Sequence, residues 1–291
     1  AFIIFLICGM DFTGAVNHAL STVSAGGFST YNESAAYFDD VYVEGWMTFF
    51  MVLAGGNFGL YYRAYHKGAA VLLKDTEFKA YLSILVVATI IIIGDLMVEL
   101  DSDFFTALRY AAFQTASIAT TGFVSADYDR WPVLSKFVLM GLMICGGCAG
   151  STAAGLKISR VVILFRSVRS TVLHLLYPKH VVEVMMNGTT LHDSTVLRVG
   201  QYFFMYIFFI LFFALLLAFD GVGGFDALGI SVSTMGCIGP AFGVTGATCT
   251  YADLSWFSKT VICFSMLLGR LEIFTILVML RPGLWKGKNT W

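Results

Sequence analysis

The sequence predicts an all-α polytopic membrane protein in which short re-entrant helices lie between the membrane spans. Composition and apolar patterning predict this class. Of the 291 residues, 58% are hydrophobic and 13% are charged, whereas a soluble domain has about 25% charged residues. Apolar runs of about 20 residues, the length that crosses a bilayer, recur along the chain. With so few charges, most of the surface must face lipid or other membrane helices.

Five apolar segments are long enough to cross a bilayer. They are residues 41–65, 80–100, 131–150, 195–219 and 254–280. Residues 156–176 continue after Gly150 as a second, more basic half-helix. Between the spans lie three apolar segments that are too short to cross, residues 12–23, 104–118 and 225–235. Segments of this length predict re-entrant helices.

Each short segment runs into a polar stretch that contains glycine. In all three stretches a hydroxyl residue precedes a glycine by five positions. The pairs are Thr22 with Gly27, Ser117 with Gly122, and Thr234 with Gly239. Three such pairs in phase between apolar spans indicate an internal repeat of span, short helix, glycine stretch and span. The alternative is that these glycines only allow close helix packing, as small residues commonly do in membranes.

Glycine stretches at membrane depth suit a cation pathway. Backbone that leaves a helix inside the bilayer must be buried in protein or line a water-filled cavity. Glycine permits conformations that turn carbonyl oxygens toward an axis, and rings of such carbonyls replace the hydration shell of a cation. The negative C-terminal end of each short helix also favours a cation. The sequence therefore predicts a central pore for a monovalent cation.

The charged residues predict the orientation, because basic residues accumulate on the cytoplasmic side. Three basic groups belong there: Arg63, Lys67, Lys74 and Lys79; Lys157, Arg160, Arg166, Arg169 and Lys179; and Arg281, Lys286 and Lys288. The segments after the glycine stretches carry acids, namely Glu33, Asp39, Asp40, Asp127, Asp129 and Asp253. We expect these acids outside, where an acidic rim concentrates cations. Each acid taken singly is equally well explained as a solvated loop residue.

Other function classes find little support in the sequence. The chain has neither HExxH nor GxSxG and no pair of intramembrane aspartates, so an intramembrane enzyme is not indicated. It has no P-loop or dinucleotide fingerprint, and no organic cofactor is expected. Its net charge of −1 argues against a nucleic-acid partner. Cys145 and Cys148 have the spacing of a redox pair, but their apolar run favours a packing role.

Four motifs resemble the Trk/Ktr/HKT superfamily of potassium transport proteins, and most closely its Trk pore subunits. The first two are HALSTVSAGGFST at residues 18–30 and FQTASIATTGF at residues 113–123. The other two are GGCAGSTAAGLK at residues 146–157 and LGRLEIFT at residues 268–275. The resemblance runs essentially end to end. It implies helix–pore loop–helix repeats, arranged around a central pore as in potassium channels.

The resemblance implies a selectivity filter centred on three glycines, Gly27, Gly122 and Gly239. The implied filter residues are Val23, Ser24, Ala25, Gly26, Gly27, Thr120, Thr121, Gly122, Cys237, Ile238 and Gly239. Residues 146–155, here called the gate loop, would obstruct the pore below the filter. The implied gate residues are Gly146, Gly147, Gly150, Ser151, Thr152, Gly155 and Arg270. Glycine weakens a helix by up to about 1 kcal/mol per residue, so this loop can move; close helix packing is the alternative.

Arg270 lies in the middle of the last apolar span. An intramembrane arginine is costly and is a functional candidate by default. It either faces the pore, where it repels cations, or bonds to carbonyls of the gate loop, and the two roles are compatible. Glu272 is too near in sequence to face it across a helix. His18 is expected to cap or pack, and Asn57 to be a helix-bonding amide in the outer helix of the second repeat.

Members of the superfamily have four repeats, and this chain resembles the second, third and fourth. The implied repeats are residues 1–75, with a truncated first helix, residues 76–180, with the gate loop, and residues 181–291. Because the chain opens inside an apolar run, we expect a fragment of a longer gene product. The filter residue of the first repeat would decide between potassium and sodium.

The function implied by the resemblance is potassium uptake across the cell inner membrane by the ion-translocating subunit of a Trk-type system. The transported species would be the potassium ion, with the filter loops outside. The alternative is a sodium-permeable or ion-coupled transporter of the same superfamily, with symport of Na⁺ or H⁺. The implied partners are membrane lipid, a second copy in a homodimer, and a cytosolic nucleotide-binding regulatory subunit of the TrkA type.

Overall fold

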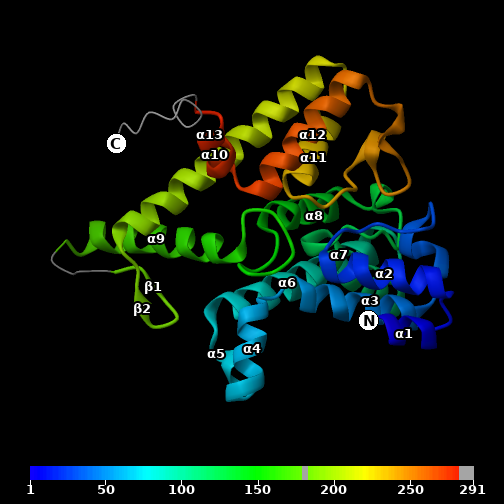
Figure 1. Cartoon of the computed structure of the whole chain (residues 1–291), viewed down its shortest axis with the longest axis horizontal. Helices are drawn as coiled ribbons and strands as arrows, with labels where there is room; N and C mark the ends of the chain where they lie inside the picture. The colour runs from blue at the N-terminus through cyan, green and yellow to red at the C-terminus, as the bar shows by residue number, and fades with distance from the viewer. Residues whose placement is uncertain (179–182, 282–291) are drawn as a thin grey trace.

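The computed structural model of the chain describes residues 1–178 and 183–281, and its described part is dominated by α-helices (Figure 1). One order of elements occurs three times: helix, short helix, glycine-containing loop, helix. The three sets are α1 (Phe2–Ile7), α2 (Phe12–Ser24) and α3 (Val41–Ala54); α6 (Thr76–Glu99), α7 (Phe104–Thr120) and α8 (Val133–Cys145); and α10 (Asp193–Phe219), α11 (Gly224–Met235) and α12 (Trp256–Leu271). The predicted all-α class with re-entrant helices is confirmed.

Further elements connect and extend these sets. They are α4 (Phe58–Lys67), α5 (Ala70–Lys74), α9 (Ile158–Leu176), the strands β1 (Met185–Met186) and β2 (Thr189–Thr190), and α13 (Ile273–Met279). Short 3₁₀ turns cover Ser34–Phe38, Tyr128–Arg130, Gly243–Thr245 and Tyr251–Asp253. The two strands pair antiparallel, with Met185 opposite Thr190. In Figure 1, α9 and this hairpin extend away from the bundle, on the side opposite to α1–α3.

Among the described residues, two unbroken helices are long and apolar enough to cross a membrane, α6 with 24 residues and α10 with 27. A third candidate is the pair α12 and α13, which is bent by 108°. The other predicted spans are shorter or broken. Residues 41–65 divide into α3 and α4 at Gly55–Asn57, and residues 131–150 are helical only as α8. The last predicted span, residues 254–280, breaks at Glu272.

Polar side chains fix where the helices begin. Those of Asp40, Asp75, Asp103 and Ser255 accept a hydrogen bond from an amide in the first turn of α3, α6, α7 and α12. Such capping satisfies amides that have no partner within the helix. Asn57 does the same for α4, accepting from the Leu60 amide at 3.1 Å. The Asn57 side chain therefore bonds the helix that follows it.

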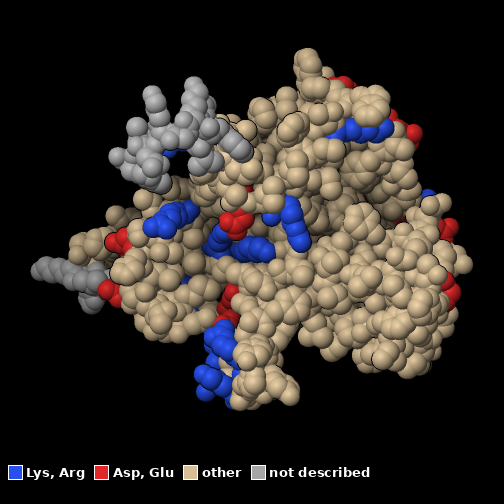
Figure 2. Space-filling model, viewed as in Figure 1, with Lys and Arg blue, Asp and Glu red and all other residues tan. Residues whose placement is uncertain are grey.

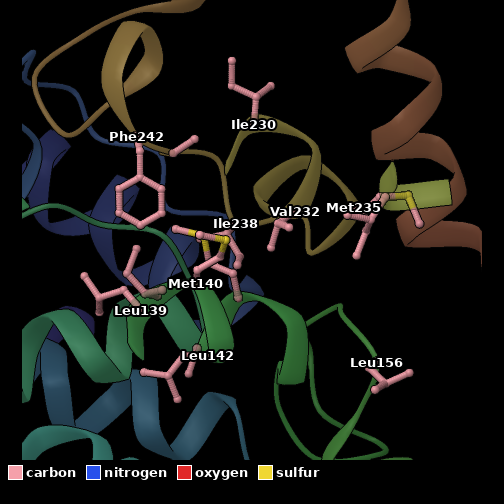
Figure 3. Packing of buried hydrophobic residues seen from close by; sticks show 14 of the residues in the cluster. Leu139, Met140, Leu142, Leu156, Ile230, Val232, Met235, Ile238 and Phe242 are labelled. Atoms are coloured by element: carbon pink, nitrogen blue, oxygen red, sulfur yellow. The ribbon is translucent and has the colours of Figure 1, made fainter. Parts of the chain in front are cut away.

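Two apolar cores hold the elements together. The smaller core joins α1, α2 and α3 to α7, through buried side chains such as Phe5, Met47 and Phe113. The larger core runs through α6, α7, α8, α10, α11 and α12. Figure 3 shows part of it, where Leu139 and Met140 of α8 lie close to Ile238 and Phe242 beyond the end of α11. The α8 helix thus supports the third glycine-containing loop.

One ion-pair group links the first two sets. The Arg109 guanidinium on α7 binds both oxygens of Glu44 on α3, at 2.7 and 2.9 Å, and Asp39 at 2.8 Å. Glu44 is buried, so this bidentate partner is needed to offset its desolvation. Of the predicted basic residues, Lys179, Lys286 and Lys288 lie outside the described residues, as does the predicted repeat boundary at 180/181.

Candidate functional site

The three re-entrant helices end in a shared way. An amide of the loop donates to the carbonyl five residues earlier, at 2.8 to 3.0 Å: Gly26 to Ser21, Gly122 to Ser117, and Ile238 to Ser233. The glycines that the sequence singled out then adopt positive φ angles, +68° at Gly27, +100° at Gly122 and +110° at Gly239. Residues with a Cβ rarely adopt these angles, so the backbone favours glycine at all three positions.

A buried polar side chain on each re-entrant helix holds the loop that follows: a serine in the second and third loops, and a histidine in the first. Ser117 donates to the Phe123 carbonyl at 2.6 Å, and Ser233 donates to the Pro240 carbonyl at 2.8 Å. In the first loop this role falls to His18, whose buried ring bonds the Gly14 carbonyl at 2.8 Å and the Ser29 hydroxyl at 2.9 Å. His18 is therefore a packed and bonded residue that shapes the first loop.

The three loops meet through their backbones. A Cβ built on Gly27 would lie 2.5 Å from the Thr121 oxygen, and one on Gly122 would lie 1.9 Å from the Ile238 oxygen. A Cβ on Gly239 would meet nothing within 4 Å. The first loop therefore abuts the second, and the second abuts the third. Any side chain at Gly27 or Gly122 would push a neighbouring carbonyl out of place.

A cavity of about 1010 Å³ lies against these loops. Its walls come from residues 24–28, Gly122 and residues 237–240, and from Lys259, Ile262, Cys263, Met266 and Arg270 of α12. Most of the predicted filter residues are thus brought together around one space. Val23, Thr120 and Thr121 are not on its wall. Thr120 instead packs against α3, where its methyl group would meet a Cβ on Gly55 at 2.3 Å.

The gate loop forms no helix in the structure and closes on itself at its base. The amides of Leu156, Lys157 and Ile158 donate to the carbonyls of Ile144, Cys145 and Gly147, at 3.0 to 3.1 Å. Gly146 and Gly155 both have positive φ, and a Cβ on Gly146 would lie 2.2 Å from the Ala154 oxygen. The glycines at the base therefore allow two backbone segments to touch.

The body of the gate loop fills the break between α3 and α4. The Cys148 amide donates to the Gly55 carbonyl at 2.8 Å, and the Phe58 amide donates to the Gly150 carbonyl at 3.2 Å. The Thr152 hydroxyl lies 3.0 Å from the Val23 carbonyl and 3.3 Å from the Ala54 carbonyl. The loop thereby reaches the end of α2, directly before the first filter loop.

Arg270 lies between two cavities. It lines the large cavity beside the filter loops, and it also lines a smaller one of about 220 Å³. The walls of the smaller cavity are residues 151–155, Lys157, Tyr202, Gly269, Arg270 and Glu272. Arg270 donates to the Thr152 carbonyl at 2.9 Å. Its position therefore suits both expected roles, a charge beside the pathway and a bond to the gate loop.

The break between α12 and α13 is held by a second ion pair. Glu272 has a φ of +62°, and its carboxylate lies 2.8 Å from the Arg160 guanidinium on α9. Arg160 also lies over the Tyr202 ring, 3.8 Å from its centroid. Figure 2 shows basic and acidic side chains gathered at the centre of this face, near where the loop between α8 and α9 lies in Figure 1. The pair of Arg160 and Glu272 joins α9 to the bend between α12 and α13.

Sequence reasoning missed two residues that support these loops. The Tyr251 hydroxyl donates to the Gly239 carbonyl at 2.5 Å, so a filter carbonyl is held by a residue after the loop. Glu77 accepts hydrogen bonds from amides in and after the gate loop. No local pattern marks either residue, because their partners lie 12 to 82 positions away.

The acidic segments contain structural contacts. Asp129 accepts from the Gly243 amide at 3.1 Å, which joins the segments after the second and third glycine stretches. Asp127 pairs with the neighbouring Arg130 at 3.0 Å, and Asp39 pairs with Arg109. Burial raises the pKa of Asp129 above its ordinary value. Asp129 and Asp39 therefore link separate segments of the chain, whereas Asp127 pairs within its own turn.

Comparisons with known proteins agree with this architecture. The family model for TrkH, described as a cation transport protein, matches residues 9–287. The chain is 34% identical to the Trk system potassium uptake protein TrkH of Halomonas elongata over 288 residues, which cover 97% of this chain and 58% of that protein. It is 31% identical to the Escherichia coli TrkH over 283 residues, which cover 96% and 58% respectively.

Among solved structures, the chain superposes on the crystal structure of the potassium transporter TrkH from Vibrio parahaemolyticus with a TM-score of 0.90. The sequences are 30% identical, and the match covers 98% of this chain and 61% of that one. The chain thus spans about three fifths of the length of these relatives. Since the family match takes in the re-entrant helices, the glycine loops and the gate loop alike, the chain belongs to the TrkH family of cation transport proteins.

Proposed function

We propose that this chain forms part of a pore that carries potassium ions across the cell inner membrane, as the translocating subunit of a Trk-type system. The observation that carries the proposal is the convergence of three glycine loops on one cavity, with their backbones in contact. Its relatives are named as potassium uptake proteins. The ion is the transported substrate, and the chain itself needs no chemistry beyond binding and release.

Selectivity is assigned to backbone carbonyls of the three loops. Carbonyls that replace the hydration shell of an ion discriminate between ions through their number, spacing and dipoles. The loops suit this role because positive φ at Gly27, Gly122 and Gly239 turns the chain without a side chain at the point of contact. The remaining predicted filter residues, in residues 23–26, 120–121 and 237–238, supply the adjoining backbone.

Gating is assigned to the gate loop together with Arg270. The loop lies next to the filter, since the Thr152 hydroxyl bonds the Val23 carbonyl, and Arg270 bonds the Thr152 carbonyl from the other side. A positive charge beside the pathway repels cations by direct Coulomb interaction. Movement of the loop away from α3 would remove both the obstruction and the bond that places Arg270.

Orientation and assembly follow the charges. We place the filter loops outside and the basic residues of α4, α5 and α9 in the cytoplasm. The same basic surface suits a cytosolic nucleotide-binding regulatory subunit, and the chain is assigned to a homodimer. The division into three repeats, with boundaries after residues 75 and 180, follows the recurring order of elements.

The test is growth rescue of a potassium-uptake-deficient bacterium at low potassium by the gene product that carries this sequence. Gly122→Ser is expected to weaken potassium-over-sodium selectivity, because its Cβ would displace the Ile238 carbonyl. The control is Gly141→Ser on α8, where a Cβ would meet nothing within 4 Å. Absence of rescue by correctly inserted protein, or an unchanged permeability ratio in Gly122→Ser, would contradict the proposal.

A further inference from the structure

Glu77 is a buried carboxylate at the start of a membrane span, with only 6% of its surface exposed. It is not needed to begin α6, because Asp75 already caps that helix by accepting from the Phe78 amide at 3.0 Å. Burying a carboxylate costs several kcal/mol unless hydrogen bonds compensate. The partners of Glu77 therefore indicate what the residue does.

The hydrogen-bond partners of Glu77 belong to the gate loop or its exit. One oxygen, Oε1, accepts from the Ala149 amide at 2.5 Å and from the Ser159 amide at 3.1 Å. Ala149 lies inside the loop, and Ser159 lies in the first turn of α9, directly after it. Hydrogen bonds to an ionised acceptor are roughly twice as strong as neutral ones. A single carboxylate on α6 thus ties the loop to the helix that follows.

The bond to Ala149 completes a series of three. The Cys148 amide is held by the Gly55 carbonyl at the end of α3, and the Gly150 carbonyl is held by the Phe58 amide at the start of α4. Between them, the Ala149 amide is held by α6. Of the three, only the bond from Glu77 is made by a side chain, so it can be removed without altering a backbone.

We propose that Glu77 is a positioning residue that clamps the gate loop into the break between α3 and α4. Without the clamp, the loop leaves this position more often, and the pathway is open for a larger fraction of the time. The inference rests on the proposed function of the loop as a gate. The clamp itself is tested by a readout that does not depend on transport.

Two natural cysteines provide that readout. Cys148 in the loop is fully buried, while Cys145 at the end of α8 is half-buried. In single-cysteine versions of the full-length gene product, Glu77→Ala is expected to raise the rate of Cys148 modification by a thiol reagent by about tenfold, since local opening sets this rate. The rate at Cys145 is expected to stay unchanged.

Asp95 offers a matched control on the same helix. Its carboxylate accepts from the amide and the hydroxyl of Ser135 on α8, at 2.9 and 2.5 Å, near the other end of α6. Asp95→Ala removes a comparable carboxylate and is expected to leave the rate at Cys148 unchanged. An unchanged rate in Glu77→Ala, or equal rises at Cys148 and Cys145, would overturn the clamp.

A second variant and a flux measurement complete the test. Glu77→Gln keeps a carbonyl oxygen without the charge, and it is expected to raise the Cys148 rate by roughly threefold; no rise there would also overturn the clamp. Potassium flux per protein in proteoliposomes is expected to rise with the Cys148 rate. A raised Cys148 rate with unchanged flux would keep the clamp and reject the loop as the gate.

Discussion

The three glycine loops of the predicted filter and the gate loop are both irregular backbone inside a membrane protein, but the gate loop is held more by contacts with distant parts of the chain. Each filter loop is bonded to its own helix: Ser117 reaches Phe123, six residues on, and Ser233 reaches Pro240, seven residues on. The gate loop is closed locally at its base and at Ser151, whose amide and hydroxyl donate to the Cys148 carbonyl at 3.2 and 2.6 Å. Its body bonds to Val23, Glu77 and Arg270, which lie 129, 72 and 118 positions from their partners.

This difference separates a part that stays in place from a part that can move. Local bonds persist when neighbouring helices shift, since both partners travel together. The contacts of the gate loop join it to α2, α3, α6 and α12, and each can be broken without unfolding a helix. The proposed gated, selective pathway requires such an arrangement, with a filter that stays in place above a loop that moves.

Of the substitutions that test this difference, Arg270→Ala is expected to change potassium transport the most. The change removes a charge beside the cavity and a charge-assisted bond to the Thr152 carbonyl, so potassium conductance should rise by roughly tenfold. The permeability ratio of potassium to sodium should stay near that of the unmodified protein, because the filter loops keep their own bonds. Single-channel or liposome flux recordings measure both quantities.

Lys259→Ala is the matched control, because Lys259 is a cation on the same helix and the same cavity. It bonds the Ala252 carbonyl instead of the gate loop, and no rise in conductance is expected. Loss of folded protein in Arg270→Ala without any gain in conductance would make the arginine purely structural.

Ser117→Ala tests the filter side of the comparison. It leaves the buried Phe123 carbonyl without the hydroxyl bond at 2.6 Å, which is expected to lower the free energy of unfolding by about 1–3 kcal/mol. Selectivity for potassium over sodium should fall by roughly fivefold, while Cys148 in the gate loop keeps its protection from thiol reagents. Thr171→Ala, which removes an exposed hydroxyl bond on α9, is the control. Increased labelling of Cys148 in Ser117→Ala would show that the two loops are not independent.

Thr152→Val should give the smallest change. It keeps the shape of the side chain but removes the hydroxyl bonds to the Val23 and Ala54 carbonyls. The expected result is a rise in flux of roughly threefold at unchanged selectivity, as for the loss of one neutral hydrogen bond. Thr152→Ser retains the hydroxyl and should behave as the unmodified protein. A change in selectivity would place Thr152 in the filter instead.

Features held by local contacts could be predicted from the sequence, whereas most features held by distant contacts could not. The re-entrant helices and their glycines are recognisable because their signals are local, such as Ser117 five residues before Gly122. Sequence reasoning also anticipated that Arg270 would bond a gate-loop carbonyl, although it left this role beside a pore-facing one. The structure shows this bond, and it also places Arg270 on the wall of the cavity beside the glycine loops.

The bend between the last helices, α12 and α13, and the role of Glu77 could not be predicted, because their hydrogen-bond and ion-pair partners lie far away in the sequence. The break at Gly55–Asn57 had a local signal, two glycines followed by a good N-cap residue, but the apolar run around it favoured a continuous span. The bend at Glu272 has no glycine or proline at the break. The ion pair at the bend joins Glu272 to Arg160, which lies 112 positions earlier. Glu77 likewise reads as an ordinary first-turn acid until α6 is placed beside the loop.

Because the gate loop fills the break between α3 and α4, these two parts must be considered together when chimeras are made between relatives. The Gly55 carbonyl and the Phe58 amide find their partners in Cys148 and Gly150, and a Cβ on Gly147 would lie 2.8 Å from the Gly55 oxygen. Donor and recipient surfaces are therefore shaped to each other. A chimera that exchanges residues 146–155 alone would meet an α3 end built for another loop, so residues 55–58 must be exchanged with it.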